Sequence, residues 1–288
     1  MKILVTGAAG QLGLSMTRRL AAQHSVAALT RRDLDITSAC AVLAAVHGER
    51  PDLIVNCASY NDVNRAETEP VAALEANAWA VKHLVRAAAE TGATLVHFST
   101  DFVFDGETDR PYRETDAPNP KSNYAISKLL GEWLALESGG HYVIRVESLF
   151  GGPKAKSSVD LLLNAIVSGG EARAFSDRVV SPSYVEDVSA ATERLIATRP
   201  APGLYHCVNQ GYGTWVDVAR ELASAAGKPD ARIAPVKVAE VNLTPPRPRF
   251  AALSNDKLTA AGIPMPGWQD AIRRYVAQTG TLAGLPAS

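Results

Sequence analysis

The first residues of the chain join a short apolar run to a glycine-rich turn. Lys2 to Thr6 is a β-prone run, and Gly7, Gly10 and Gly13 follow it at G-x-x-G-x-x-G spacing. A helical pattern begins at Leu14. Small residues between a strand and a helix let the backbone approach a pyrophosphate, and the helix N-terminus supplies free N–H groups. The pattern predicts a dinucleotide-binding turn, with a tight turn that binds no ligand as the alternative.

Strand and helix patterns alternate along much of the chain. Apolar β-prone runs occupy residues 2–6, 25–30, 52–58, 93–98, 142–146 and 203–208. Helical patterns lie between them, and further ones cover 159–166, 215–226 and 268–278. This alternation predicts an α/β protein with a Rossmann-type doubly wound parallel sheet and a smaller C-terminal α/β substrate-binding region. We expect an NAD(P)-binding domain over 1–150 and a mainly substrate-binding region over 151–288, of which about 174–200 returns to the Rossmann sheet.

The end of the second strand bears on the choice of cofactor. An enzyme that uses NAD usually places an acidic residue there for the ribose 2′-hydroxyl. Here the strand ends in Thr30-Arg31-Arg32, and Asp33 comes too late for that role. Two guanidinium groups suit a 2′-phosphate, although they would also suit a solvated basic loop. The sequence therefore favours NADPH, with NADH as the alternative.

Polar residues follow two later strands. Ser59-Tyr60-Asn61 comes after the third strand, and Ser99-Thr100-Asp101 ends the fourth. Ligands of parallel sheets bind outside the carboxyl ends of the strands, so we expect both segments to face the cleft. His97 lies inside an apolar run and is predicted to be a packed core residue, because no G-x-S-x-G elbow supports a Ser-His-Asp triad.

Tyr124 and Lys128 are four residues apart in a segment with helical periodicity. Positions i and i+4 share one face of a helix, so a phenol and an ammonium would lie side by side. An adjacent cation favours the phenolate, and a tyrosine poised in this way can exchange a proton near neutral pH. An ordinary helix with one exposed lysine is the alternative.

Composition excludes several function classes. The 288 residues carry a net charge of -1 and contain no basic run, so no nucleic-acid partner is expected. The three cysteines are far apart and form no C-x-x-C, which disfavours disulfides and zinc, and no spacing points to another metal. We recognise neither a signal peptide nor an apolar run of the roughly 18 residues that a membrane span needs, so we expect a cytoplasmic protein without a membrane partner.

Taken together, these features resemble the extended, sugar-nucleotide-modifying branch of the short-chain dehydrogenase/reductase superfamily. The closest resemblance is to the dTDP-4-dehydrorhamnose reductase family. It rests on the segments Thr6–Gly13, Leu34–Thr37, Ser99–Gly106, Tyr124–Glu132, Gly203–His206, Thr214-Trp215 and Arg247-Pro248, and so covers nearly the whole chain.

The resemblance implies a role for each matching residue. Tyr124 would protonate the keto oxygen as hydride arrives, Lys128 would lower its pKa and hold the nicotinamide ribose, and Thr100 would bind the same oxygen. The remaining implied cofactor contacts are Gly7, Gly10, Gln11, Leu12, Gly13, Arg31, Arg32, Asp35, Ile36, Ser59, Tyr60 and Asn61. The implied substrate contacts are Thr100, Asp101, Ser148 and Arg247.

The implied activity is NADPH-dependent reduction of the 4-keto group of a nucleotide-linked deoxysugar, in nucleotide-sugar and cell-surface polysaccharide biosynthesis. The partner would be that small-molecule substrate, and a homodimer is left open. Three positions depart from the family pattern, with Ser148 for a tryptophan, Asn64 for an aspartate and Ala251 for a serine, and all three are expected to lie on the substrate side. The alternatives are an epimerase or dehydratase of the same branch and a non-catalytic, NADP-binding regulatory subunit.

Overall fold

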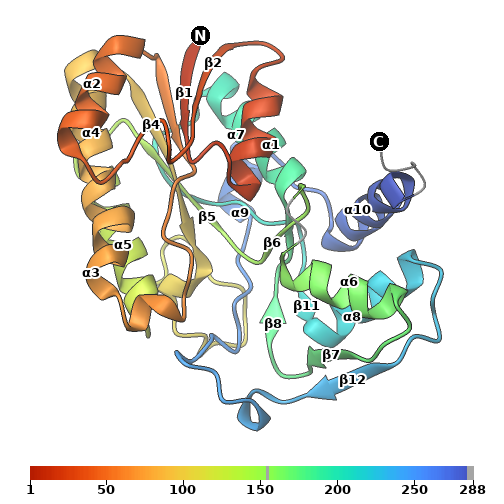
Figure 1. The fold of residues 1–288 in the computed structure, drawn as a ribbon. Coiled ribbons are helices and arrows are strands. Elements are labelled where there is room, and N and C mark those ends of the chain that lie inside the picture. Colours follow the sequence, from red (N-terminus) through yellow and green to blue (C-terminus); the bar gives the residue numbers. More distant parts are fainter. Residues whose placement is uncertain (154–155, 284–288) are drawn as a thin grey trace.

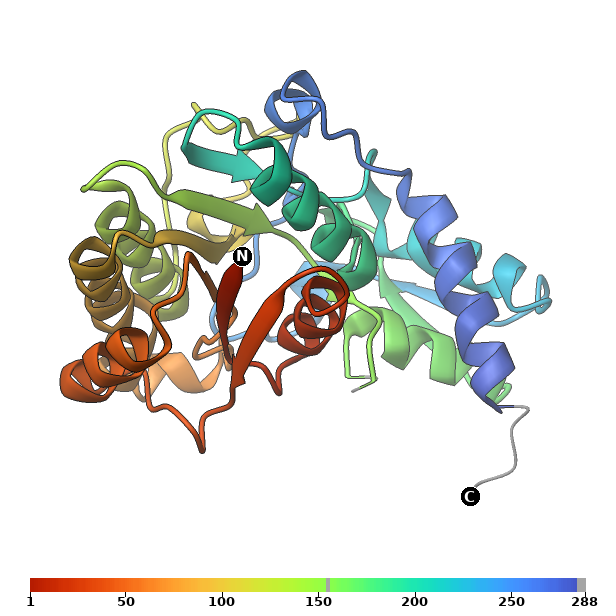
Figure 2. The same ribbon diagram turned by 90° about the horizontal axis from the view of Figure 1, so that it is seen from above.

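The computed structural model describes residues 1–153 and 156–283. Figures 1 and 2 show a helix-covered sheet beside a second group of helices and short strands. The strands are β1 (Lys2–Thr6), β2 (Ser25–Leu29), β3 (Leu53–Asn56), β4 (Thr94–Thr100), β5 (Tyr142–Val146), β6 (Leu149–Phe150), β7 (Ala172–Phe175), β8 (Val179–Val180), β9 (Ser183–Tyr184), β10 (Gly203–His206), β11 (Gly213–Thr214) and β12 (Ile233–Val236).

The helices follow the predicted periodicity. They are α1 (Gln11–Leu20), α2 (Ala39–Glu49), α3 (Pro70–Leu74), α4 (Ala80–Thr91), α5 (Asn123–Leu136), α6 (Ser158–Val167), α7 (Val185–Thr198), α8 (Trp215–Ala225), α9 (Asp256–Ala260) and α10 (Trp268–Ala283), with the π-helical turn η2 (Glu75–Trp79) between α3 and α4 and the 3₁₀ turns η1 (Arg65–Glu67), η3 (Asp101–Val103) and η4 (Val238–Glu240). Ser38 caps α2 through Ala41 N, and Thr214 caps α8 through Asp217 N.

A six-stranded parallel sheet with strand order β10-β5-β4-β3-β1-β2 runs through the described part of the chain. Leu4 of β1 pairs with Ala27 on one side and Ile54 on the other. The chain winds in opposite directions from β1 and from β3, so the gap between their carboxyl ends is the topological switch point where ligands of such sheets bind. The predicted doubly wound sheet is confirmed.

The alternation of side chains along β1 separates two apolar layers. Ile3 and Val5 pack with Met16 of α1 and Val188 of α7, whereas Leu4 packs on the opposite face with Val46 of α2 and with α4. All of these side chains are buried. The sheet is therefore covered on both sides, as a parallel sheet requires.

The C-terminal half contributes both to the sheet and to a second layer. Helix α7 packs against α1, and β10 extends the sheet beside β5, so the strand that rejoins the sheet lies after the range of about 174–200. The small sheets β7–β12 and β8–β11 lie with α6, α8 and α10 beside the main sheet (Figure 1). This second layer faces the carboxyl ends of β1, β4 and β5 and encloses a cleft there.

Candidate active site

Two adjoining cavities lie at the carboxyl ends of the parallel strands. The first has a volume of about 450 Å³ and the second about 490 Å³. Both are lined by Gly10 and by the segment that follows β3, so together they form one groove across the switch point. A groove of this length at this place suits an extended ligand such as a dinucleotide.

The glycine turn forms the floor between the two cavities. Gly7 has a φ of +64°, and a Cβ built on it would lie 2.6 Å from the backbone nitrogen of Ala58. A Cβ on Gly13 would overlap the carbonyl oxygen of Gly7. The turn and the start of α1 therefore pack backbone to backbone, which leaves the helix N-terminus open to the groove. This cradle fits the pyrophosphate of a dinucleotide, with Gln11 and Leu12 lining its far side.

The second cavity has the composition expected of an adenosine site. Asp35, Ile36, Tyr60 and Arg31 line it, as the sequence predicts, whereas Arg32 does not. Arg65 also lines it and was not identified from the sequence, because it lies far from the strand end at Thr30 and follows no recognisable pattern. One predicted arginine and one unpredicted arginine thus lie where a 2′-phosphate could bind.

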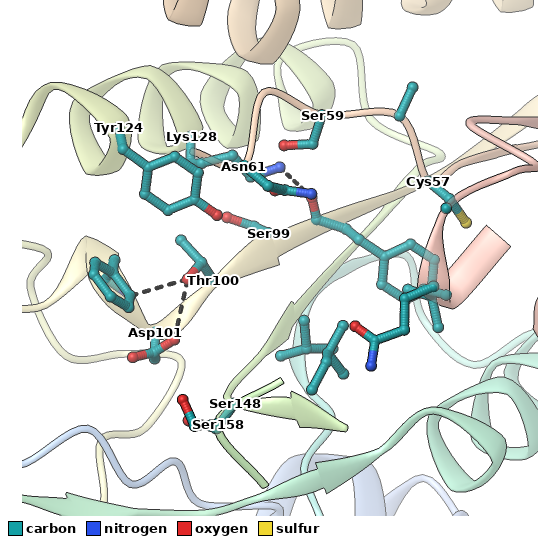
Figure 3. Close-up of a pocket in the computed structure, with 18 of the residues that line it drawn as sticks. Cys57, Ser59, Asn61, Ser99, Thr100, Asp101, Tyr124, Lys128, Ser148 and Ser158 are labelled. Carbon is teal, nitrogen blue, oxygen red and sulfur yellow. Dashed lines mark hydrogen bonds between the residues drawn. The ribbon is translucent and has the colours of Figure 1, made fainter. Parts of the chain in front are cut away.

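The first cavity brings together the three residues predicted to act on substrate. Tyr124 and Lys128 extend from α5, and Thr100 ends β4 (Figure 3). In the figure, the hydroxyl end of the Tyr124 ring points toward Ser99 and Thr100. Ser122 caps the first turn of α5 through Ala125 N, which fixes the start of the helix at Asn123, one residue before Tyr124.

The pKa of Tyr124 is raised in the structure, whereas the sequence predicts that the adjacent Lys128 lowers it. Burial raises the pKa of the Tyr124 hydroxyl, the nearby Asp101 carboxyl raises it further, and contact with the Thr100 hydroxyl opposes them. The Lys128 ammonium instead donates a hydrogen bond to the carbonyl oxygen of Phe98 at 2.6 Å. Its own pKa is lowered by burial to about 8. Tyr124 therefore keeps its proton at neutral pH, which is the form that a general acid needs.

The hydroxyl of Ser99 does not act as a free group in the cleft. It donates to Glu132 Oε1 at 2.5 Å, and Glu132 forms a buried ion pair with Arg145 at 2.6 Å. His97, two residues before Ser99 on β4, is fully buried and contacts Asn56 through Nδ1, in agreement with its predicted core role. These interactions tie β4, β5 and α5 together beneath the cavity.

Asp101, Glu147 and Arg178 form a buried charge cluster at the far side of Thr100. Burial raises the pKa of Asp101 to about 7, and burial together with the Asp101 carboxyl raises that of Glu147 well above its usual range. Burial lowers the pKa of Arg178, while both carboxyls oppose that effect. One of the two carboxyls therefore stays protonated near neutral pH, because two buried like charges cannot ionise independently.

Of the predicted substrate contacts, Asp101, Ser148 and Arg247 all line the first cavity. Ser148 has a φ of +42° and donates to Glu147 Oε1 at 2.5 Å, and Figure 3 shows it with Ser158 across the cavity from Tyr124. Arg247 lies over the Phe102 ring and donates to Asn64 Oδ1 at 2.5 Å.

The placement of Ala251 on the substrate side is wrong. Its side chain is buried in the core, and its backbone nitrogen donates to the carbonyl oxygen of Val179 at 2.8 Å. A serine-to-alanine difference at this position therefore changes core packing rather than a cavity contact. Asn64 reaches the cavity only through Arg247.

Several residues of the first cavity were not identified as site residues from the sequence, among them Arg178, Trp215 and Ser158. Arg178 and Trp215 reach the cavity from the second layer, and Ser158 stands at the start of α6. Asn77 does not line the cavity but supports the segment after β3. Its side-chain amide forms hydrogen bonds with Ser59 Oγ and with the backbone of Tyr60. The only sequence signal for Asn77 was an amide inside an apolar helix.

Two features are absent from residues 1–153 and 156–283. These residues contain no group of three or more histidine, cysteine, aspartate or glutamate side chains able to hold a metal ion. None of their helices has both the length and the apolar character of a membrane-spanning segment.

Comparison with known proteins agrees with the geometry. The family model described as RmlD substrate binding domain matches residues 1–281. The spore coat polysaccharide biosynthesis protein SpsK of Bacillus subtilis is 34% identical over 96% of this chain and 96% of its own length. The dTDP-4-dehydrorhamnose reductase of Mycobacterium tuberculosis is 34% identical over 96% of this chain and 92% of its own.

A solved structure supports the same relationship. The dTDP-4-dehydrorhamnose reductase of Bacillus anthracis in complex with NADP has a TM-score of 0.90 and 29% identity to this chain. The alignment covers 96% of this chain and 99% of that one. The similarity therefore includes both the dinucleotide-binding sheet and the second layer.

Proposed function

The chain belongs to the RmlD substrate binding domain family, and from that premise we propose that it reduces the 4-keto group of a nucleotide-linked deoxysugar with NADPH. The observation that carries the proposal is the meeting of Thr100, Tyr124 and Lys128 in one cavity, which continues into the groove over the glycine turn. The family assignment and the NADP complex of the Bacillus anthracis relative support the choice of cofactor.

The residues of the first cavity suit the reduction of a carbonyl. A bound nicotinamide supplies the hydride, with its two electrons, to the carbonyl carbon. Tyr124 donates the proton that the carbonyl oxygen takes up, and its raised pKa keeps that proton available. Thr100 lies beside Tyr124, and its hydroxyl, which donates to Asp101 Oδ1 at 3.0 Å in the structure, turns toward the carbonyl oxygen when substrate binds and stabilises the developing negative charge.

Lys128 has a separate part in this scheme. Its ammonium is fixed by Phe98 O at the end of β4 and lies in the cavity wall, where it binds the ribose next to the nicotinamide. Because the ammonium is buried, its charge acts in a medium of low dielectric and helps to stabilise the tyrosinate that forms when Tyr124 gives up its proton.

A dehydratase of the same branch is the second candidate, and the carboxyl pair of Asp101 and Glu147 is the observation that raises it. Such an enzyme needs a carboxylate oxygen free to remove a proton from carbon. Both oxygens of Glu147 are occupied, one by Ser148 Oγ and one by Ser181 N, each at 2.5 Å. Asp101 Oδ2 has no hydrogen-bond partner within the described residues, so the carboxyl pair alone does not exclude the dehydratase, and the family assignment is what favours the reductase. An epimerase of the same branch is a further alternative. A reductase consumes NADPH with each turnover, whereas an epimerase shows no net consumption, so this measurement separates the two.

A regulatory subunit without catalysis is the third candidate. A protein without catalysis has no need for Thr100, Tyr124 and Lys128 to lie in one cavity. Because these three residues do line one cavity, the regulatory role is disfavoured. The nucleotide-sugar is the proposed partner. The cytoplasm and a homodimer remain predictions that accompany this function.

The direct test is NADPH consumption with a panel of nucleotide-linked 4-ketosugars. We expect turnover by the unaltered protein and a loss of about 10² to 10⁴-fold in Tyr124→Phe, with NADPH affinity kept. Ile126→Ala on the exposed face of the same helix is the control and keeps full turnover. Undiminished turnover by Tyr124→Phe would refute the assigned acid.

A further inference from the structure

The first turn of α1 depends on a ligand for its cap. Its N-cap residue is Gly10, which has no side chain, whereas serine or threonine side chains cap α2, α5, α6 and α8. The first N–H groups of a helix have no partner within the helix. A pyrophosphate bound at the glycine turn accepts hydrogen bonds from these groups and so orders the first turn of α1.

The side chain of Gln11 connects this turn to the second layer. Its Nε2 donates to the carbonyl oxygen of Gly151, the residue that follows β6, at 2.8 Å. The backbone of Gly152 packs on the same side chain, since an added Cβ there would lie 3.6 Å from Gln11 Cγ. Both glycines have a positive φ, of +86° and +79°, which lets the chain turn closely against the helix start. Gln11 therefore joins the dinucleotide cradle to the segment after β6.

Three aromatic rings continue this contact into the second layer. Gly151 lies directly against the ring of Tyr184, because an added Cβ would overlap it. The Tyr184 ring stacks on that of Phe150 with 5.3 Å between the centroids. The Tyr275 ring of α10 lies 5.5 Å from the Phe150 centroid and 5.9 Å from that of Tyr184. All three side chains are buried, and close-packed interiors transmit small displacements.

The chain of contacts ends at the start of α6. The hydroxyl of Tyr275 donates to Asp160 Oδ1 in the first turn of that helix. Asp160 Oδ2 accepts from the Oγ of Ser157, the N-cap residue, at 2.6 Å and so closes a capping box. The next residue, Ser158, lines the first cavity, whereas Tyr275 and Asp160 line neither cavity. The connection between the two ligand sites therefore runs behind the cleft.

We propose that Gln11 is a positioning residue that couples the two sites: a dinucleotide bound at the glycine turn orders the start of α6 and thereby raises the affinity of the cleft for its second ligand. The proposal rests on the proposed function for the identity of that ligand, the nucleotide-sugar. By linkage, the nucleotide-sugar raises the affinity for the dinucleotide by the same factor. The factor is set by one neutral hydrogen bond and is about 2 to 10-fold.

A purely structural role of these contacts has a different consequence. If the contacts only stabilise the fold, loss of the Gln11–Gly151 or the Tyr275–Asp160 hydrogen bond loosens α6 to the same extent with and without dinucleotide. If they couple the sites, the loss removes the response of α6 to the dinucleotide. The ratio of amide exchange rates in α6 without and with dinucleotide separates the two cases, because a general destabilisation cancels from that ratio.

The test measures amide hydrogen exchange in α6 with and without saturating NADP⁺. The variants are Gln11→Met and Tyr275→Phe, each of which removes one donor and keeps most of the side-chain bulk. Tyr275→Phe is the more decisive variant, since its hydroxyl lies outside both cavities. Gln23→Met, at an exposed glutamine after α1, is the control for the first. Tyr205→Phe is the control for the second, because that buried hydroxyl bonds to Ala201 O at 2.7 Å, away from this chain of contacts.

We expect NADP⁺ to slow exchange in α6 by about 2 to 10-fold in the unaltered protein and in both controls, and to leave it unchanged in both variants. Calorimetry establishes that each protein is saturated with NADP⁺. Protection of α6 in Tyr275→Phe equal to that in the unaltered protein would overturn the proposal. So would a lack of protection in the unaltered protein with NADP⁺ bound.

The exchange experiment needs no turnover, so this proposal and the proposed function can fail separately. If no ketosugar supports NADPH oxidation, the proposed function fails, and the response of α6 to NADP⁺ still decides the coupling. With a ketosugar that is reduced, Tyr275→Phe should raise the KM for the sugar by about 2 to 10-fold and keep kcat. An unchanged KM in Tyr275→Phe would contradict the coupling.

Discussion

The Nζ atom of Lys128 donates a hydrogen bond to the carbonyl oxygen of Phe98 at 2.6 Å. Phe98 stands two residues before Thr100 on β4, and Lys128 stands one helical turn after Tyr124 on α5. This single bond therefore joins the two elements that carry the proposed acid and the proposed oxyanion donor. The lysine fixes the register of α5 on the sheet as well as supplying charge.

We predict that Arg31 discriminates between the two nicotinamide dinucleotides more strongly than Arg32. Arg31 lines the adenosine-side cavity and Arg32 does not. Arg31→Ala should raise the KM for NADPH by about 10 to 100-fold through loss of charge-assisted hydrogen bonds, and leave that for NADH nearly unchanged. Arg32→Ala serves as the matched control with a smaller effect. Equal losses for both dinucleotides in Arg31→Ala would contradict a 2′-phosphate contact.

Gly7→Ala should destabilise the fold by about 1–3 kcal/mol and weaken dinucleotide binding. The added Cβ meets the Ala58 backbone at 2.6 Å, and φ at this residue is +64°. Gly48→Ala in α2 meets nothing within 4 Å and should stabilise the protein by about 0.5–1 kcal/mol. Urea midpoints measure both changes, and a neutral Gly7→Ala would show that the turn is not closely packed.

Asp101 should make stability fall as pH rises toward neutrality. Burial raises its pKa in the folded protein to about 7 from an ordinary value of 3.8. The folded state therefore binds more protons than the unfolded state between these values, and the free energy of unfolding decreases as pH rises through that window. From pH 5 to pH 8, the free energy of unfolding should fall by about 2 kcal/mol more in the unaltered protein than in Asp101→Asn, as measured by urea titration at each pH.

The control for this titration has the opposite pKa shift. The hydrogen bond from Arg110 lowers the pKa of Asp116 to about 2, so this carboxylate stays ionised throughout the range from pH 5 to pH 8. Asp116→Asn should consequently keep the pH slope of the unaltered protein. The same slope in Asp101→Asn would show that Asp101 does not titrate in this range.

The sheet and the meeting of Thr100, Tyr124 and Lys128 in one cavity were predictable because parallel strands share one direction. Once the glycine turn sets the first βα unit, each later strand must end at the same edge, and polar residues at those ends must meet. Thr100 and Tyr124 follow from this rule. The rule needs only the order of elements along the chain.

The substrate wall was less predictable, because its contacts join residues far apart in sequence. Arg247 bonds to Asn64 across 183 positions, and Arg178 meets Asp101 only after the second layer folds over the sheet. Neither pairing has a local periodicity. The pKa of Tyr124 was mispredicted for a related reason, since the depth of burial that raises it is not visible in the spacing of Tyr124 and Lys128.

The most direct measurement of the central claim is isotope transfer from NADPH deuterated at the nicotinamide C4 position to a nucleotide-linked 4-ketosugar. The account predicts that the unaltered protein yields a sugar carrying deuterium on the former carbonyl carbon, read by NMR. It predicts that Tyr124→Phe, which binds NADPH equally well, yields almost none. The account would be contradicted by a protein that binds both compounds and transfers no deuterium, or by equal transfer in Tyr124→Phe.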